Sequence, residues 1–202
     1  IAFSTVVGGA SARLTGGNFW QGAVTGLVVS GLNHTMHKIQ EKATLNKAIR
    51  DGGYGKILDD DPYLNWSNDE IVEFASKVFP DLYKSANNPS FEKQTMIGND
   101  PNIAGQAQAE RLGVQGKYTI RSLGKILIRS NVLNSIRQLG SVVGHELNHM
   151  TDYVNGAYAG WINQYGLVKG KAFSEVKAYR WQESMGAPFN PQEYNNYLNL
   201  IK

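Results

Sequence analysis

The residues of this 202-residue chain that are best suited to chemistry form one short run, His145-Glu-Leu-Asn-His149. If the run is helical, its two histidines lie one turn apart on one face, so both imidazoles can reach the same metal ion. Glu146 lies beside them, where a carboxylate can take a proton from a metal-bound water. The run therefore predicts a zinc site with His145 and His149 as ligands and Glu146 as the general base of a hydrolytic reaction.

The sequence around this run predicts a long amphipathic helix. Its apolar residues recur at helical spacing, at Ile136, Leu139, Val143, Leu147 and Met150. Asn155-Gly156 is a typical C-terminal stop. Burial of the apolar face would make the histidine face line a cleft. Just upstream, residues 118–122 and 125–129 predict two short strands joined by a Ser-Leu-Gly turn, and such an edge strand can pair with an extended peptide backbone.

Catalytic zinc usually takes three protein ligands, so one more ligand is expected outside the motif. Glu175 is the leading candidate, at the start of a second helical segment that Ser174 would cap. A carboxylate at that position would also be favoured by the helix dipole alone. Glu183 is an alternative on the same segment. Asp152 shares the histidine face, and a hydrogen bond to a ligand imidazole suits it better than direct ligation.

The runs HELNHMTDY, from His145 to Tyr153, and SEVKAYRW, from Ser174 onward, resemble the gluzincin branch of zinc metallopeptidases. The similarity is closest to thermolysin-type enzymes and to the catalytic domain of anthrax lethal factor, and it covers roughly the last seventy residues. It implies a zincin-like fold and a third zinc ligand at Glu175. Gluzincins often carry a Tyr or His that stabilises the oxyanion. The resemblance assigns that role to Tyr165, with Tyr158 and Tyr179 as open alternatives.

Residues 1–50 are rich in Gly, Ser and Thr, which predicts a Gly-rich, partly helical connector. The apolar run over residues 23–32 is shorter than the about 20 residues that span a bilayer, so no stable transmembrane segment is expected. The runs Gly16-Gly-Asn-Phe-Trp-Gln-Gly22 and Ser30-Gly-Leu-Asn-His34 resemble the segment before the toxic tip of Rhs/YD-repeat polymorphic toxins. This resemblance implies a secreted toxin delivered into a target cell, a delivery scaffold and a cognate immunity protein.

The region between the connector and the motif contains one clear helix start. Ser67-Asn-Asp-Glu70 is a capping box, followed by an apolar-periodic segment that ends before Pro80. Residues 97–116 show little periodicity, which predicts a long surface loop over the cleft.

The composition narrows the classes of function. The net charge is +3 and the Lys and Arg residues are scattered, so a nucleic-acid partner is not expected. Cysteine is absent, which excludes disulfides and thiol chemistry within this sequence. No Gly-x-Ser-x-Gly motif or Gly-rich phosphate loop is present.

Together these patterns predict an α+β protein with a zincin-like metallopeptidase domain over residues 55–202. The domain would contain a small sheet, an active-site helix and a third-ligand helix. The expected function is a Zn²⁺-dependent endopeptidase that acts on protein or peptide substrates as a secreted interbacterial effector. A non-catalytic binding module on the same scaffold and a metal-dependent cell-wall amidase are the alternatives.

Overall fold

A computed structural model of the chain describes residues 44–98, 103–114 and 117–202. The connector expected in residues 1–50 lies mostly outside the described residues, as do both of its toxin-like runs. A helical segment from residue 44 to 49 leads into the described elements. These are η1 (Arg50–Tyr54), α3 (Gly55–Asp60), α4 (Asn68–Val78), α5 (Pro80–Ser85), β1 (Ser90–Gln94), β2 (Gly105–Val114), β3 (Lys117–Arg129), η2 (Ser130–Asn134), α6 (Ile136–Val154), α7 (Ala157–Ser184) and α8 (Pro191–Ile201).

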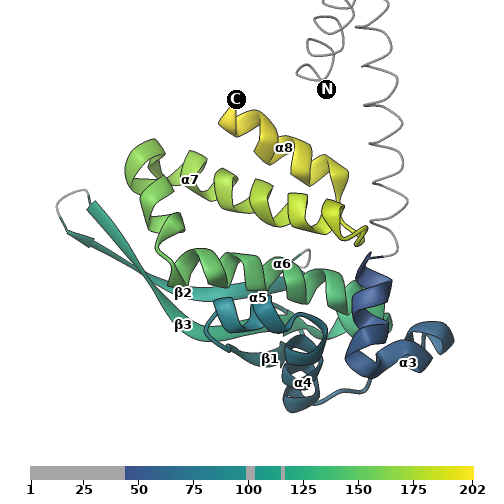
Figure 1. Cartoon of the computed structure of the whole chain (residues 1–202). Coiled ribbons are helices and arrows are strands. Elements are labelled where there is room, and N and C mark those ends of the chain that lie inside the picture. The colour runs from purple at the N-terminus through teal and green to yellow at the C-terminus, as the bar shows by residue number, and fades with distance from the viewer. Residues whose placement is uncertain (1–43, 99–102, 115–116) are drawn as a thin grey trace, which may run out of the picture. The chain divides into compact units, whose positions relative to one another are not determined.

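The three strands form a mixed sheet in the order β1-β3-β2. The central strand β3 runs parallel to β1 and antiparallel to β2, with Ala107 of β2 opposite Ile126. Figure 1 shows α6 lying across this sheet, α7 packed on α6, and α8 on the outer side of α7. A small sheet covered by helices confirms the α+β class.

Helix α6 lies at the centre of the domain because its apolar positions match the helical period. The predicted residues Ile136, Leu139, Val143, Leu147 and Met150 are all fully buried. They pack in one core with the apolar residues of β3 and α4. The helix ends as predicted, at Asn155, and Gly156 follows with a φ of 80°. The capping box of Ser67 and Glu70 is also confirmed at the start of α4.

Two predictions about the sheet are wrong. Residues 118–122 and 125–129 belong to one strand, β3, rather than to two. The strand continues through a shift in its pairing with β2 between Ala107 and Ala109, and Gly124 adopts a φ of 65° there. The loop expected over residues 97–116 contains β2, which is held by backbone pairing with β3 and so needs little apolar periodicity. The strand at the sheet edge beside α6 is therefore β2.

The prediction that a second helix begins at Glu175 is also wrong. Helix α7 begins at Ala157 and is interrupted once, at Gly166, where φ is 82° and ψ is 170°. Beyond this bend Gly170 approaches the backbone of Ile162 so closely that an added Cβ would lie 2.8 Å from its Cα. Glu175 therefore sits in the interior of α7, away from a helix N-terminus. Ser174 is buried and cannot cap the helix.

Residues ahead of position 55 contribute to the same core. Leu45 and Ile49 are fully buried, and the Leu45 amide donates a hydrogen bond to the Met185 carbonyl over 3.0 Å. Contacts define a compact unit over Ala43–Lys202. The domain thus begins before residue 55, where the sequence placed its start.

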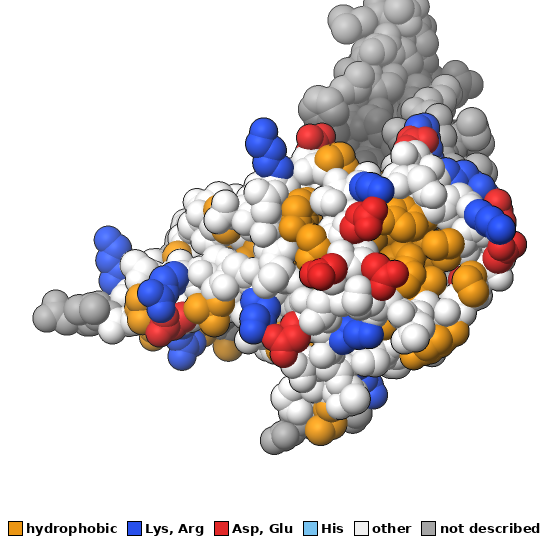
Figure 2. All heavy atoms as spheres, turned by 90° about the horizontal axis from the view of Figure 1, so that it is seen from below, with side chains coloured by type: hydrophobic (Ala, Val, Ile, Leu, Met, Phe, Trp, Pro, Cys, Tyr) orange, Lys and Arg blue, Asp and Glu red, His pale blue; other side chains and the backbone are white. Residues whose placement is uncertain are grey.

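The described surface mixes charges of both signs. Figure 2 shows one face on which Lys and Arg side chains are spread among Asp and Glu side chains. Several of the basic residues are paired, as in Lys77 with Glu73 and Lys125 with Glu92. Within the part of the chain that the structure describes, no helix has the length and apolar character needed to cross a bilayer.

Candidate metal centre

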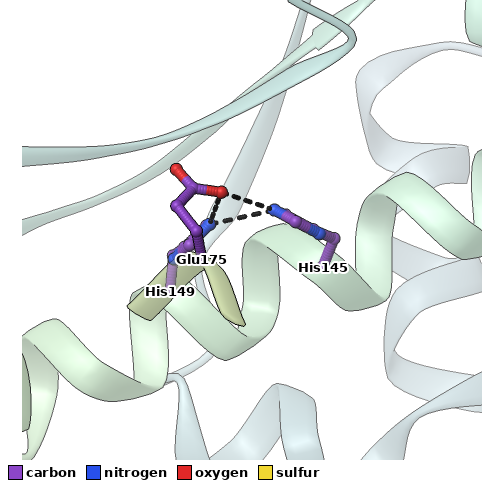
Figure 3. A group of neighbouring side chains, drawn as sticks. All are labelled: His145, His149 and Glu175. Atoms are coloured by element: carbon purple, nitrogen blue, oxygen red, sulfur yellow. Dashed lines mark hydrogen bonds and ion pairs between the residues drawn. The ribbon is translucent and has the colours of Figure 1, made fainter. Parts of the chain in front are cut away.

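Helices α6 and α7 bring His145, His149 and Glu175 together, as Figure 3 shows. The two Nε2 atoms lie 3.0 Å apart. The Glu175 Oε2 atom lies 3.5 Å from each of them. All three side chains are mostly buried, with 9 to 16% of each exposed. The three residues predicted as ligands from the sequence therefore form a group that can hold a metal ion.

The spacing of these atoms fits zinc. Tetrahedral Zn²⁺ with bonds of about 2.1 Å places neighbouring ligand atoms about 3.4 Å apart. The separations of 3.0, 3.5 and 3.5 Å are close to that geometry. Zinc sites with two imidazoles and one carboxylate as protein ligands keep a fourth position for water or substrate.

The ring of His145 is oriented by Gln182. Its Nδ1 lies 2.9 Å from Gln182 Oε1. The Gln182 amide nitrogen donates to Ser141 Oγ over 2.7 Å and to the Pro188 carbonyl over 3.3 Å, which fixes the side of the amide that faces the imidazole. His145 therefore donates from Nδ1, and its Nε2 presents a lone pair to Glu175.

The ring of His149 is oriented through a serine. His149 Nδ1 lies 2.8 Å from Ser174 Oγ, and the Ser174 hydroxyl donates to Asp152 Oδ2 over 3.1 Å. Since the hydroxyl proton is used on Asp152, Ser174 accepts from His149 Nδ1–H. Asp152 is fully buried and also accepts a hydrogen bond from Lys177. Asp152 thus supports a ligand imidazole, as predicted, but it does so through Ser174.

These hydrogen bonds point three acceptor atoms at one another, which favours a cation between them. Burial would lower the pKa of His149, yet the hydrogen bond and the charge of Glu175 raise that pKa above its usual value. Burial would raise the pKa of Glu175, yet hydrogen bonds that the two histidines donate when their rings are protonated hold it well below its usual value. The two shifts together favour a positive charge on the imidazole side facing an ionised Glu175, and a divalent cation can supply that charge.

Glu146 projects from α6 toward the sheet edge. Its side chain is buried, and its Oε2 accepts a hydrogen bond from the Ala107 amide of β2 over 2.8 Å. At Gly105 an added Cβ would lie 2.8 Å from Glu146 Cγ, so glycine leaves room for the carboxylate. Glu146 is not one of the three converging ligands. This placement agrees with a base beside the metal ligands, and the catalytic role itself stays a prediction.

The close approach of α6 and α7 depends on Gly144, the residue before the motif. A Cβ at this position would lie 1.7 Å from the Trp181 ring. The indole also packs edge-on against Phe79, with ring centroids 5.5 Å apart. A side chain at position 144 would push the two ligand-bearing helices apart. Gly144 was not singled out from the sequence, although it directly precedes His145 and the structure leaves no room for a side chain there.

Tyrosines surround the ligands, but Tyr165 is not the closest. Its side chain is 44% exposed and packs against Phe173. The Tyr179 ring lies 5.0 Å from the His145 ring. Tyr158 packs on Tyr153, which stacks on the ring of His149. Of the three tyrosines considered for the oxyanion, Tyr179 is in direct contact with a ligand imidazole and Tyr158 is one ring removed.

Burial raises the pKa of the Tyr158 and Tyr179 phenols, and a hydrogen bond to the Glu193 carboxylate raises that of Tyr179 further. Both phenols therefore stay protonated at neutral pH, and the Tyr179 hydroxyl donates to Glu193. Glu183, the alternative ligand, lies farther along α7 and is outside the metal-binding group found among the described residues.

No family model, curated protein or solved structure matches this chain. The functional conclusion therefore comes from the geometry of the site.

Proposed function

We propose that this chain is a zinc-dependent endopeptidase with a zincin-like fold. The observation that carries the proposal is the convergence of His145 Nε2, His149 Nε2 and Glu175 Oε2 at separations of 3.0 to 3.5 Å. Glu146 lies on the same helix and is held against the edge strand β2. Metal ligands and a neighbouring base can activate water for peptide hydrolysis, and a strand edge can bind an extended peptide substrate.

Each residue of the site would have a separate role in the reaction. His145, His149 and Glu175 would hold Zn²⁺, which supplies a Lewis acid that activates water and polarises the substrate carbonyl. Glu146 would take the proton of the attacking water and deliver it to the leaving amine. A protonated tyrosine would donate a hydrogen bond to the oxygen that gains negative charge. Tyr158 suits this role better than Tyr179, because the Tyr179 hydroxyl is hydrogen-bonded to Glu193.

The substrate would lie as an extended strand along β2. Within the part of the chain that the structure describes, β2 is an edge strand that pairs with β3 alone, and an edge strand can accept a further strand. The Ala107 amide ties that strand directly to Glu146. A peptide added there would gain main-chain hydrogen bonds and would pass beside the base.

We further propose that the enzyme acts as the toxic tip of a secreted interbacterial effector. Support comes from the resemblance of the runs starting at Gly16 and Ser30 to polymorphic-toxin connectors, in residues outside those described. Expression of the chain in the cytosol and, separately, in the periplasm of a test bacterium would reveal where it is toxic. Toxicity that Glu146→Gln retains would refute the enzymatic part of this proposal.

The enzymatic proposal is tested with zinc-loaded protein, denatured protein substrates and purified peptidoglycan. Cleavage of the proteins that Glu146→Gln abolishes is the expected result. Release of peptides from peptidoglycan alone would assign a cell-wall amidase. Stoichiometric zinc without hydrolysis of either substrate would assign a non-catalytic module.

A further inference from the structure

Two positive side chains lie on the two elements, β2 and α7, between which the substrate would lie, and this space is called the substrate groove. Lys171 sits on α7 one helical turn before Glu175, and Arg111 sits on β2 beyond Ala107. Figure 1 shows the β2–β3 hairpin and the bend of α7 at the same end of the domain. There Asn163 of α7 both donates to and accepts from the Tyr118 backbone of β3, over 2.8 and 2.7 Å. Strand and helix are thus tied together on this side.

Both cations are exposed and rest on tyrosine rings. The Lys171 ammonium lies 5.8 Å from the centroid of Tyr197, and the Arg111 guanidinium lies 5.4 Å from that of Tyr118. In the described ranges, neither forms an ion pair with a carboxylate. Arg121 differs, because it is paired with Glu110 on the same hairpin. Lys171 is also hydrogen-bonded to the Tyr197 hydroxyl and interacts with the charge of Glu175. Neither cation is neutralised by a direct ion pair among the described residues, so both keep a positive charge that a ligand can meet.

The charges of Lys171 and Arg111 both act on the hydroxyl of Tyr158. Burial raises the pKa of the Tyr158 phenol above its usual value, with the charge of Glu175 adding to the rise, and the charges of Lys171 and Arg111 oppose it. Both cations and Glu175 therefore act on Tyr158, whose ring packs on Tyr153, the residue that stacks on His149. Bound zinc would offset the negative charge of Glu175, which would leave this end of the groove positive.

We propose that this end of the groove selects substrate residues with carboxylate side chains, and the proposal rests on the endopeptidase function above. One helical turn rises about 5.4 Å, so Lys171 would meet a side chain one or two residues from the scissile bond. Arg111 lies four residues along β2 from Ala107, about 13 Å, and would meet a side chain about four residues away. An extended peptide on β2 with Asp or Glu at these positions would satisfy both cations.

The test uses quenched-fluorescence peptides that differ only in one residue, Asp, Ala or Lys, placed in turn at each position around the cleaved bond. With zinc-loaded full chain, Asp over Lys is expected to raise kcat/KM about fivefold at one position within two residues of the bond. The preference should shrink as salt approaches 1 M, where the screening length is about 3 Å. Lys171→Glu should invert the preference, and Lys169→Glu, with the same charge change on exposed α7 surface, should keep it.

Three results would overturn the inference. Equal kcat/KM for Asp and Lys peptides at every position, with protein substrates still cleaved, would refute the proposed selectivity but not the proposed endopeptidase function. The same loss of preference in Lys171→Glu and Lys169→Glu would show only a general charge effect. Absence of hydrolysis and of zinc binding would overturn the proposed function and this inference together.

Discussion

Replacing Ser174 with alanine removes the hydroxyl that joins His149 to Asp152. The hydroxyl is buried and makes both contacts, over 2.8 and 3.1 Å, so its loss leaves a ligand imidazole without its Nδ1 partner. Groups that orient a metal ligand typically contribute about 10–100-fold to metal affinity. We therefore expect zinc affinity to fall by that factor, which corresponds to about 1.4–2.7 kcal/mol.

The metal-free protein should lose stability as well, because a buried group left without its hydrogen bond costs about 1–3 kcal/mol. Two assays separate the effects. Competition with a chromophoric chelator reports zinc affinity, and urea unfolding in EDTA reports the stability of the metal-free fold. Ser184→Ala is the matched control, since its exposed hydroxyl contacts only the Trp181 carbonyl at the end of α7. Ser174→Thr, which keeps the hydroxyl, should recover most of the affinity.

A zinc affinity of Ser174→Ala within twofold of wild type would refute the orienting role. The same would follow if Ser184→Ala lowered the affinity equally, since the effect would then belong to α7 as a whole. A loss of stability in EDTA without a loss of zinc affinity would assign Ser174 to the core alone.

Gly144→Ala should destabilise the fold by about 3 kcal/mol in urea, because its new Cβ would lie 1.7 Å from the indole of α7. Gly160→Ala, where nothing lies within 4 Å, should instead stabilise it by about 0.5–1 kcal/mol. Glu175→Ala should lower zinc affinity by more than about 100-fold, and Glu183→Ala should leave it within a few fold, as chelator titration would show. The raised pKa of His149 stabilises the metal-free fold below the unfolded pKa of about 6.5, and this contribution is lost as pH rises through the folded pKa. Zinc needs the deprotonated ring, so the gain in Tm on adding zinc should widen from pH 5.5 to 8, and a constant gain would contradict this.

The sequence correctly predicted those parts of the site whose residues recur at the spacing of a helix. The spacing of His145 and His149 fixed their common face, and the apolar residues around them fixed which side of α6 is buried. Glu175 was identified by resemblance to the gluzincin pattern, and the structure brings it to the histidines. Its predicted setting was wrong, because a glycine at position 166 bends α7 without ending it.

The features that were predicted wrongly or missed depend on contacts between segments that are distant in the sequence. Strand β2 has little apolar alternation, and only its pairing with β3 defines it. Ser174 and Gln182 are ordinary polar residues in the sequence. Their roles arise because α7 packs against α6 and places them at the imidazole Nδ1 atoms. No local pattern encodes that packing.

The central claim is that Zn²⁺ binds between α6 and α7 on three named side chains. A crystal structure of the zinc-loaded chain, with anomalous data at the zinc edge, tests it most directly. We predict one zinc per chain, coordinated by His145 Nε2, His149 Nε2 and a Glu175 carboxylate oxygen. A zinc bound elsewhere, or no anomalous peak between these residues after incubation with excess zinc, would contradict it.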